Sequence, residues 1–260
     1  MAMPIPVAGA MIVLATGCAG RNAGPSAGPS ERPAAATQGT AARSARPAPR
    51  GRSHRAKSSP APARAGRPSP RFSATVSGPL SPNAVPFSWR RGCPVSPRQL
   101  RAIRLSYVGF DGAAHTGEII VNASVVKKVI KVFSVLYRSR FPIRRMEPVD
   151  AFHGSDPRSM AADNTSGFNC RRAVALGPPQ WSMHAYGLAI DVNTVENPYI
   201  EAGIGVRPRA GAAFVNRSEI RPGMAYPGGT LVSAFRSIGW GWGGYWQGSP
   251  DYQHFSVNGR

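Results

Sequence analysis

The chain has 260 residues, with 32 Lys and Arg against 12 Asp and Glu, which gives a formal net charge of +20. Residues 1–85 hold eleven Lys or Arg and the single acid Glu31. This basic segment is either a solvated linker or a binder of nucleic acid, membrane lipid or anionic cell-wall polymers. The rest of the chain has no zinc-finger, RRM or helix-turn-helix signature, which argues against specific nucleic-acid binding.

The N-terminus is predicted to be a lipoprotein-type signal peptide of residues 1–18. An apolar run ends in Ala15-Thr16-Gly17-Cys18, which resembles the signal of a bacterial lipoprotein, with Cys18 as the lipidated residue. The run is too short for a convincing membrane span. It also lacks the basic residues that usually precede such a run. We expect an extracytoplasmic protein, secreted or anchored at the cell envelope.

Residues 19–85 are predicted to be a disordered, basic linker. Ala, Pro, Ser, Gly and Arg dominate this segment, and large apolar side chains are scarce. Such a sequence buries too little apolar surface to offset the entropy lost on ordering. Residues 86–260 hold all five Trp and all seven Tyr and are predicted to form one domain. Cys93 and Cys170 in this domain predict a disulfide if the protein is exported, with two buried thiols as the alternative.

The first elements of the domain are predicted from turn residues and apolar spacing. Residues 96–104 begin with Ser and Pro and predict a short helix. Two apolar segments around Asp111-Gly112 predict a β-hairpin. From Ala123 to Ser139, apolar residues recur at three- and four-residue spacing with basic residues opposite them, which predicts an amphipathic helix.

The later elements complete a mixed fold. We expect a strand at residues 146–152, strands at 187–192 and 254–257, and a helix at 230–238. The polar, irregular segment at 154–179 is of a length that is usually functional in a compact domain. Together these elements predict an α+β fold, in which helices pack on one side of a small, mainly antiparallel sheet.

Two short segments carry His and Asp together. One runs from Ser182 through His184 to Asp191, and the other from Asp251 to His254. Asp191 emerges from an apolar strand, where an unpaired buried carboxylate would be costly. Because two His and one Asp suit zinc and leave a fourth position for water, His184, Asp191 and His254 are predicted to bind one Zn²⁺. Asp251 is predicted to be the general base that takes a proton from that water.

The pattern S-x-H-x-x-G-x-A-x-D, followed by D-x-x-H, resembles the zinc D-Ala-D-Ala carboxypeptidases of the VanY type, whose relatives include L-Ala-D-Glu endopeptidases. The resemblance covers residues 93–260. It includes the flanking segments Asn164–Arg171, Asn193, Asn197–Tyr199 and Gly239–Trp246. It implies the same three metal ligands and an acid at Asp251, where most relatives have Glu.

Relatives also use an Arg in an S-G-x-R segment to stabilise the oxyanion, and here this chain departs from the pattern. The matching place holds Asp150-Ala-Phe-His153. Arg171 is the best substitute, with Arg172 as its neighbour and alternative. Ser182 and Trp242 are candidates for substrate contact. The alternatives are a Ser that bonds only to backbone and a Trp that packs in the core.

The resulting hypothesis is a zinc metallopeptidase that cleaves peptidoglycan stem peptides, first of all at the terminal D-Ala-D-Ala bond. Cleavage of the L-Ala-D-Glu bond is the alternative within the same class. A non-catalytic, zinc-containing module that binds cell wall is a different class, and the acid at Asp251 argues against it. A third hypothesis is that the basic linker is the functional part, an adhesin for anionic wall polymers, and that the domain is only attached to it.

Overall fold

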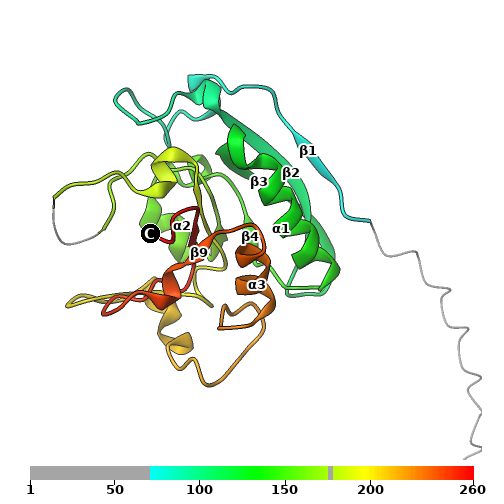
Figure 1. Cartoon of the computed structure of the whole chain (residues 1–260), viewed down its shortest axis with the longest axis vertical. Coiled ribbons are helices and arrows are strands. Elements are labelled where there is room, and N and C mark those ends of the chain that lie inside the picture. Colours follow the sequence, from blue (N-terminus) through cyan, green and yellow to red (C-terminus); the bar gives the residue numbers. More distant parts are fainter. Residues whose placement is uncertain (1–70, 175–177) are drawn as a thin grey trace, which may run out of the picture. The chain divides into compact units, whose positions relative to one another are not determined.

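The structure, a computed structural model, describes residues 71–174 and 178–260 (Figure 1). The predicted signal peptide, Cys18 and residues 19–70 of the predicted linker lie outside the described residues. The strands are β1 (Ala74–Val76), β2 (Leu100–Val108), β3 (Ala114–Asn122), β4 (Arg145–Met146), β5 (Asn164–Thr165), β6 (Ala189–Asp191), β7 (Tyr199–Glu201), β8 (Gly205–Arg207), β9 (Gly241–Trp242) and β10 (His254–Ser256). The α-helices are α1 (Val126–Arg138), α2 (Asp156–Ala161) and α3 (Thr230–Arg236). The 3₁₀ helices are Pro82–Ala84, Pro97–Gln99, Ala123–Val125, Val149–Phe152, Met183–Tyr186, Arg209–Phe214 and Gly243–Tyr245.

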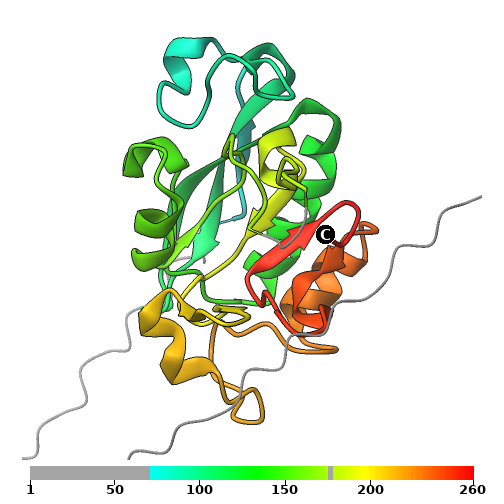
Figure 2. The same ribbon diagram turned by 90° about the vertical axis from the view of Figure 1, so that its left-hand side faces the viewer.

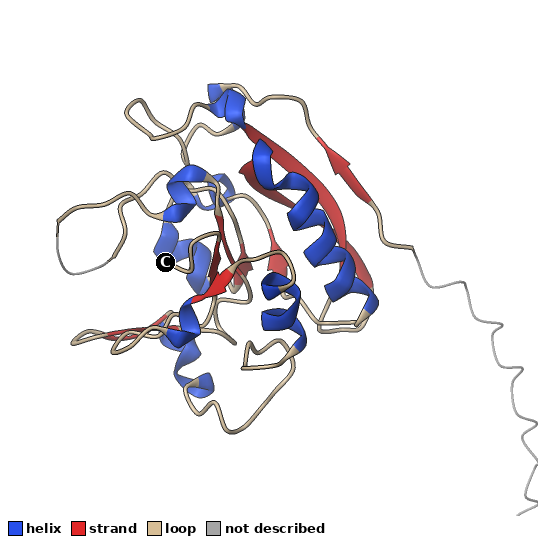
Figure 3. Cartoon of the chain, viewed as in Figure 1, coloured by secondary structure: helices blue, strands red, loops and turns tan. Residues whose placement is uncertain are grey.

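The strands are mostly antiparallel (Figure 3). One three-stranded sheet has the order β1-β2-β3 and another has the order β6-β10-β9. β7 and β8 form an antiparallel hairpin, whereas β4 and β5 pair in parallel. The predicted α+β fold with mainly antiparallel strands is confirmed, although the strands form several small sheets where one was expected. Within the described part of the chain, no helix has the length and hydrophobicity to cross a bilayer.

The core joins the long hairpin β2–β3 to the C-terminal elements. α1 lies on β2 and buries Val129, Phe133 and Leu136 of the apolar face that its periodicity predicted, together with Val132. α3 packs beside it (Figure 2). Phe235 of α3 stacks on Phe255 of β10, with ring centroids 4.2 Å apart. This packing holds β10, and with it one end of the predicted metal site, against the rest of the domain.

The predicted helix at residues 96–104 is wrong. Ser96 caps only the 3₁₀ helix Pro97–Gln99, after which the chain continues as β2. Leu100 and Ile103, taken as one helical face, lie opposite Asn122 and Ile119 of β3. The pairing of the long hairpin therefore overrides the local helical signal.

Two further predictions on residues 146–179 need correction. The strand expected at 146–152 is limited to β4, and Val149–Phe152 form a 3₁₀ helix. The segment 154–179, expected to be irregular, contains α2 and β5 among its described residues. The predicted hairpin, the helix after Ala123 and the strands around Asp191 and His254 are confirmed.

The domain begins earlier than residue 86. β1 pairs with β2, with Ala74 opposite Leu105, and the side chain of Val85 is fully buried. The predicted end of the linker at residue 85 is therefore wrong. Residues 71–85 form an edge strand and a short turn that supply few large apolar side chains, which is why composition alone did not separate them from the linker.

The predicted disulfide is confirmed. Cys93 and Cys170 are bonded, with their Cα atoms 5.9 Å apart. The amide of Cys170 also donates to the carbonyl of Ser88 at 2.9 Å. The segment around Cys170 is thus tied to the N-terminal part of the domain.

Replacing Cys93 and Cys170 together by Ser should lower the free energy of unfolding by about 2–5 kcal/mol, because the cross-link closes a long loop in the unfolded chain. The two cysteines are 77 residues apart in the sequence. Urea unfolding of the oxidised protein measures the loss, and the reduced wild type is the control that should match the variant. A variant as stable as the oxidised wild type would contradict this structural role.

Candidate metal centre

His184 lies on the 3₁₀ helix Met183–Tyr186. The hydroxyl of Ser182 caps this turn by accepting a hydrogen bond from the amide of His184 at 3.3 Å. Gly187 ends the turn with φ 66°, and a Cβ there would lie 2.6 Å from the amide nitrogen of Asn122. The Ser and Gly of the motif therefore build the turn that presents His184, since Gly adopts this backbone conformation without strain.

Asp191 and His254 are brought together by strand pairing. β6 and β10 are antiparallel, and their register places Asp191 directly opposite His254. Directly opposed residues of antiparallel strands project from the same face of the sheet as close neighbours. Strand pairing therefore brings two residues that are far apart in the sequence to one point.

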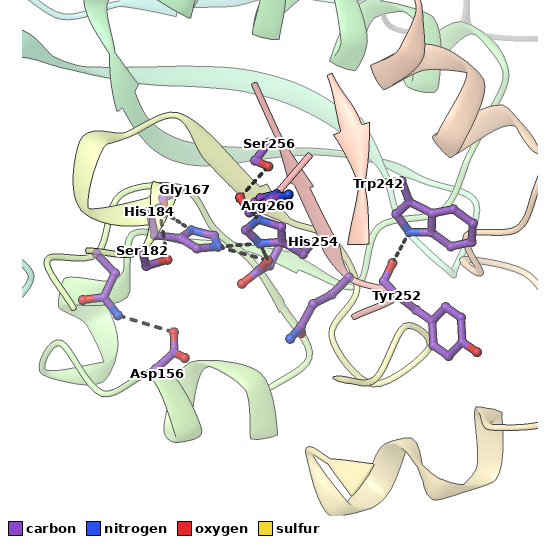
Figure 4. A network of polar contacts seen from close by, with 12 residues as sticks. Asp156, Gly167, Ser182, His184, Trp242, Tyr252, His254, Ser256 and Arg260 are labelled. Carbon is purple, nitrogen blue, oxygen red and sulfur yellow. Dashed lines mark hydrogen bonds and ion pairs between the residues drawn. The ribbon is translucent and has the colours of Figure 1, made fainter. Parts of the chain in front are cut away.

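The three predicted ligands converge on one point (Figure 4). His184 Nε2 lies 3.1 Å from Asp191 Oδ1 and 3.1 Å from His254 Nδ1, and His254 Nδ1 lies 3.2 Å from Asp191 Oδ1. Donors held at about 2.0–2.1 Å by a tetrahedral zinc are separated from one another by about 3.3 Å. All three side chains are buried. The triangle therefore has the size and donor chemistry of a zinc site.

The remaining ring nitrogens point to backbone oxygens. His184 Nδ1 lies 2.6 Å from the carbonyl oxygen of Gly167, and His254 Nε2 lies 3.3 Å from the backbone oxygen of Arg260. As donors to these oxygens, the neutral rings turn unprotonated nitrogens toward Asp191, which is how backbone carbonyls orient metal-binding His. Three lone pairs then face one another, an arrangement that calls for a cation at the centre. When these facing ring nitrogens carry protons instead, they donate to Asp191 and outweigh the effect of burial, which holds the pKa of Asp191 below its usual range.

Asp251 lies at the edge of this triangle on the turn before β10. Its amide donates to the carbonyl of Gly243 at 3.0 Å, and its backbone bridges to Tyr199 of β7. Gly243 permits this contact, because a Cβ there would lie 2.6 Å from the carbonyl oxygen of Asp251 and 3.3 Å from Cβ of His254. Gly243 of the Gly-Trp-Gly-Gly segment therefore allows Asp251, the predicted base, to lie close to the ligand His254.

The side chain of Asp251 carries an unsatisfied oxygen. Its Oδ1 is buried and has no hydrogen-bond partner among the residues that the structure describes. Burial and the nearby charge of Asp191 raise the pKa of Asp251 to about 7, against the lowering effects of His254 and Arg171. A buried carboxyl with a free oxygen and a pKa near neutrality is suited to taking up and returning a proton.

Arg171 approaches the centre from the segment that precedes the His184 turn. Its Nε forms an ion pair with Asp156 Oδ2 at 3.0 Å. Burial acts to lower the pKa of Arg171, but Asp156, Asp191 and Asp251 together raise it, so the guanidinium stays charged. The structure therefore brings Arg171 into the field of the metal centre. Arg172 instead stacks on the ring of Trp181, with 3.9 Å between its guanidinium carbon and the ring centroid.

The two predicted substrate contacts lie in structural positions. Ser182 is buried and its hydroxyl accepts the capping bond described above. Trp242 lies in the core, where its Nε1 donates to the carbonyl of Tyr252 at 2.8 Å and its ring stacks on Phe255. This burial favours the alternative role of Trp242 in core packing over contact with the substrate.

Trp246, which lies in the Gly239–Trp246 segment of the family resemblance, is the aromatic residue that packs beside His254. Its ring is partly exposed, with its centroid 5.3 Å from that of His254, and its Nε1 donates to the backbone oxygen of Gly259.

The segment that stands in place of the S-G-x-R motif, residues 150–153, makes structural contacts. Asp150 accepts bonds from the amides of Phe87 and Ser88, and His153 is exposed and packs on Phe87.

Residues 176–257 match the family model described as D-alanyl-D-alanine carboxypeptidase. This part of the chain is similar to that family. The matched segment holds all three converging ligands and Asp251, so the recognition made from the motifs is confirmed and supports a peptidase. Arg171 and Asp156 lie before it. No curated protein and no solved structure matched the chain.

Replacing His184, Asp191 or His254 singly by Ala should weaken zinc binding more than about 100-fold, because loss of a ligand exceeds the 10- to 100-fold effect of losing an outer partner. Zinc content after dialysis against a competing chelator measures this loss. His115→Ala is the matched control, since His115 is exposed and pairs with Asp111 on the hairpin. A ligand variant that keeps one zinc with wild-type affinity would show that the ion binds elsewhere.

Proposed function

We propose that the protein is a zinc-dependent peptidase that hydrolyses an amide bond in the stem peptides of bacterial peptidoglycan, specifically the terminal D-Ala-D-Ala bond. The observation that carries the proposal is the buried, unpartnered oxygen of Asp251 beside the three converging donors. The family match of residues 176–257 supports the same reaction class.

His184, Asp191 and His254 would hold the zinc ion through Nε2, Oδ1 and Nδ1. When bound, zinc supplies Lewis acidity, which activates water and polarises the scissile carbonyl. Asp251 takes the proton of the attacking water on its free oxygen and returns it to the leaving amine. This cycle requires one carboxyl that can exist in both protonation states near neutral pH. Burial and Asp191 raise the pKa of Asp251 and favour its protonated state, whereas a bound divalent ion would favour its ionised state.

Arg171 supplies positive charge where negative charge develops. Its ion pair with Asp156 uses Nε, and the two Nη groups of a guanidinium provide further N–H donors. We propose that these donors face the oxyanion of the tetrahedral intermediate or the free carboxylate of the terminal D-Ala. Arg171 thereby takes the part that relatives give to the S-G-x-R arginine.

We also propose that the protein works outside the cytoplasm. The Cys93–Cys170 disulfide supports this location, since such bonds persist in oxidising compartments. The lipoprotein-type sequence that ends at Cys18 would provide a lipid anchor, and the basic segment at residues 19–70 would contact anionic wall polymers.

The full chain loaded with zinc should release D-Ala from a synthetic pentapeptide that ends in D-Ala-D-Ala. Chelation should abolish release, and Asp251→Ala should lower kcat by about 100- to 10,000-fold, the usual contribution of general acid–base catalysis. Release of D-Ala by mass spectrometry is the measurement, with Glu219→Ala as an exposed acidic control. Cleavage only at an L-Ala-D-Glu bond would assign the alternative specificity. No cleavage of either peptide or of intact peptidoglycan, despite one bound zinc, would favour the non-catalytic module.

A further inference from the structure

Asp156 has no part in the motifs, yet it forms an ion pair with Arg171, the arginine nearest in sequence to the His184 turn apart from Arg172. It is the first residue of α2, and Figure 4 places it below the turn that carries Ser182 and His184. Its Oδ2 pairs with Arg171 Nε at 3.0 Å, and its Oδ1 accepts a bond from Asn169 Nδ2 at 3.4 Å. Both carboxylate oxygens are therefore directed at the segment that holds Arg171, and the Asp156 side chain is about one-fifth exposed.

We propose that Asp156 is a positioning residue that aims the Arg171 guanidinium at the reacting carbonyl or carboxylate of the substrate. The inference rests on the proposed peptidase function and deepens it. It assigns to the first residue of a short helix the orientation of Arg171, which takes the place of the S-G-x-R arginine of relatives.

The backbone of Arg171 is already fixed relative to the metal ligands. The amide of Asn169 donates to the carbonyl of His184 at 3.1 Å, and the amide of Ser182 donates to the carbonyl of Arg171 at 3.1 Å. The disulfide at Cys170 anchors the residue between them. What remains free is the long side chain of Arg171, whose several rotatable bonds would let the guanidinium sample many positions.

The ion pair with Asp156 restricts the Arg171 side chain and sets the position of its positive charge. Asp191 and Asp251 both attract Arg171, so a guanidinium without Asp156 would be drawn toward a metal ligand or toward the general base. The ion pair instead places Nε 3.0 Å from Asp156 Oδ2. Nη1 makes only a 3.4 Å contact with the carbonyl of Arg172, which leaves guanidinium donors available for a substrate oxygen.

The alternative role of Asp156 is that of an acid in the first turn of α2, where it would only stabilise the helix through the positive end of the helix dipole. These two roles of Asp156 predict different measurements. A helix-terminus acid acts on stability regardless of Arg171, whereas a positioning residue acts only while Arg171 is present.

A double-mutant cycle of Asp156→Asn and Arg171→Gln on the zinc-loaded full chain tests the inference. We expect Asp156→Asn to lower kcat about 10- to 100-fold with little change in KM or in the melting temperature, as for a misplaced catalytic group. The double variant should be no slower than Arg171→Gln alone. Asp156→Glu should restore part of the rate. Glu147→Gln is the matched control, because it breaks the half-exposed ion pair with Arg145 on β4 and should leave kcat unchanged.

A second readout does not depend on turnover. The Nε–H signal of Arg171 in ¹⁵N NMR spectra should be protected from solvent exchange in the wild type and lose that protection in Asp156→Asn. Rate losses that multiply in the double variant, or an Arg171 signal unaffected by Asp156→Asn, would overturn the inference. If the wild type cleaves neither peptide, the proposed function fails, and the NMR signal alone then decides whether Asp156 holds Arg171.

Discussion

The register between β6 and β10 is the constraint on which the site depends. It places Asp191 opposite His254 and, one step further along, Ile190 opposite Phe255. Ile190 and Phe255 are fully buried in the core. A slip of one residue would turn these apolar side chains away from the core and separate the two ligands at the same time. Core packing therefore determines where Asp191 and His254 meet. The turn capped by Ser182 places His184 at the same point.

Charge balance explains why this point requires a cation. Asp191 and Asp251 lie close together in a buried site, and their mutual repulsion contributes to the raised pKa of Asp251. A divalent ion between His184, Asp191 and His254 would offset that repulsion and favour the ionised form of both acids. The metal and the base are therefore coupled, since loading the site prepares Asp251 to accept a proton. Arg171, paired with Asp156, adds further positive charge that acts on both Asp191 and Asp251.

The sequence predicted those parts of the site that depend on short-range patterns. His184 and Asp191 lie within one motif, and the helix after Ala123 repeats its apolar residues over several turns. Features that depend on distant partners could not be predicted. Trp242 is buried because β9 pairs with β10, and a Trp in a groove would have the same sequence context. The Asp156–Arg171 pair depends on where α2 packs, which no local spacing encodes. The failed helix at 96–104 is similar, because its Ser, Pro and apolar spacing suit a turn followed by a strand equally well.

The central claim is that one zinc ion binds at the triangle formed by these three donors. The most direct test is a crystal structure of the zinc-loaded protein with anomalous diffraction data collected on both sides of the zinc absorption edge. The account predicts one strong peak at about 2.0–2.2 Å from His184 Nε2, Asp191 Oδ1 and His254 Nδ1, with Asp251 close by but not bound to the ion. A zinc peak elsewhere, or coordination through His254 Nε2 or through Asp251 in place of Asp191, would contradict it.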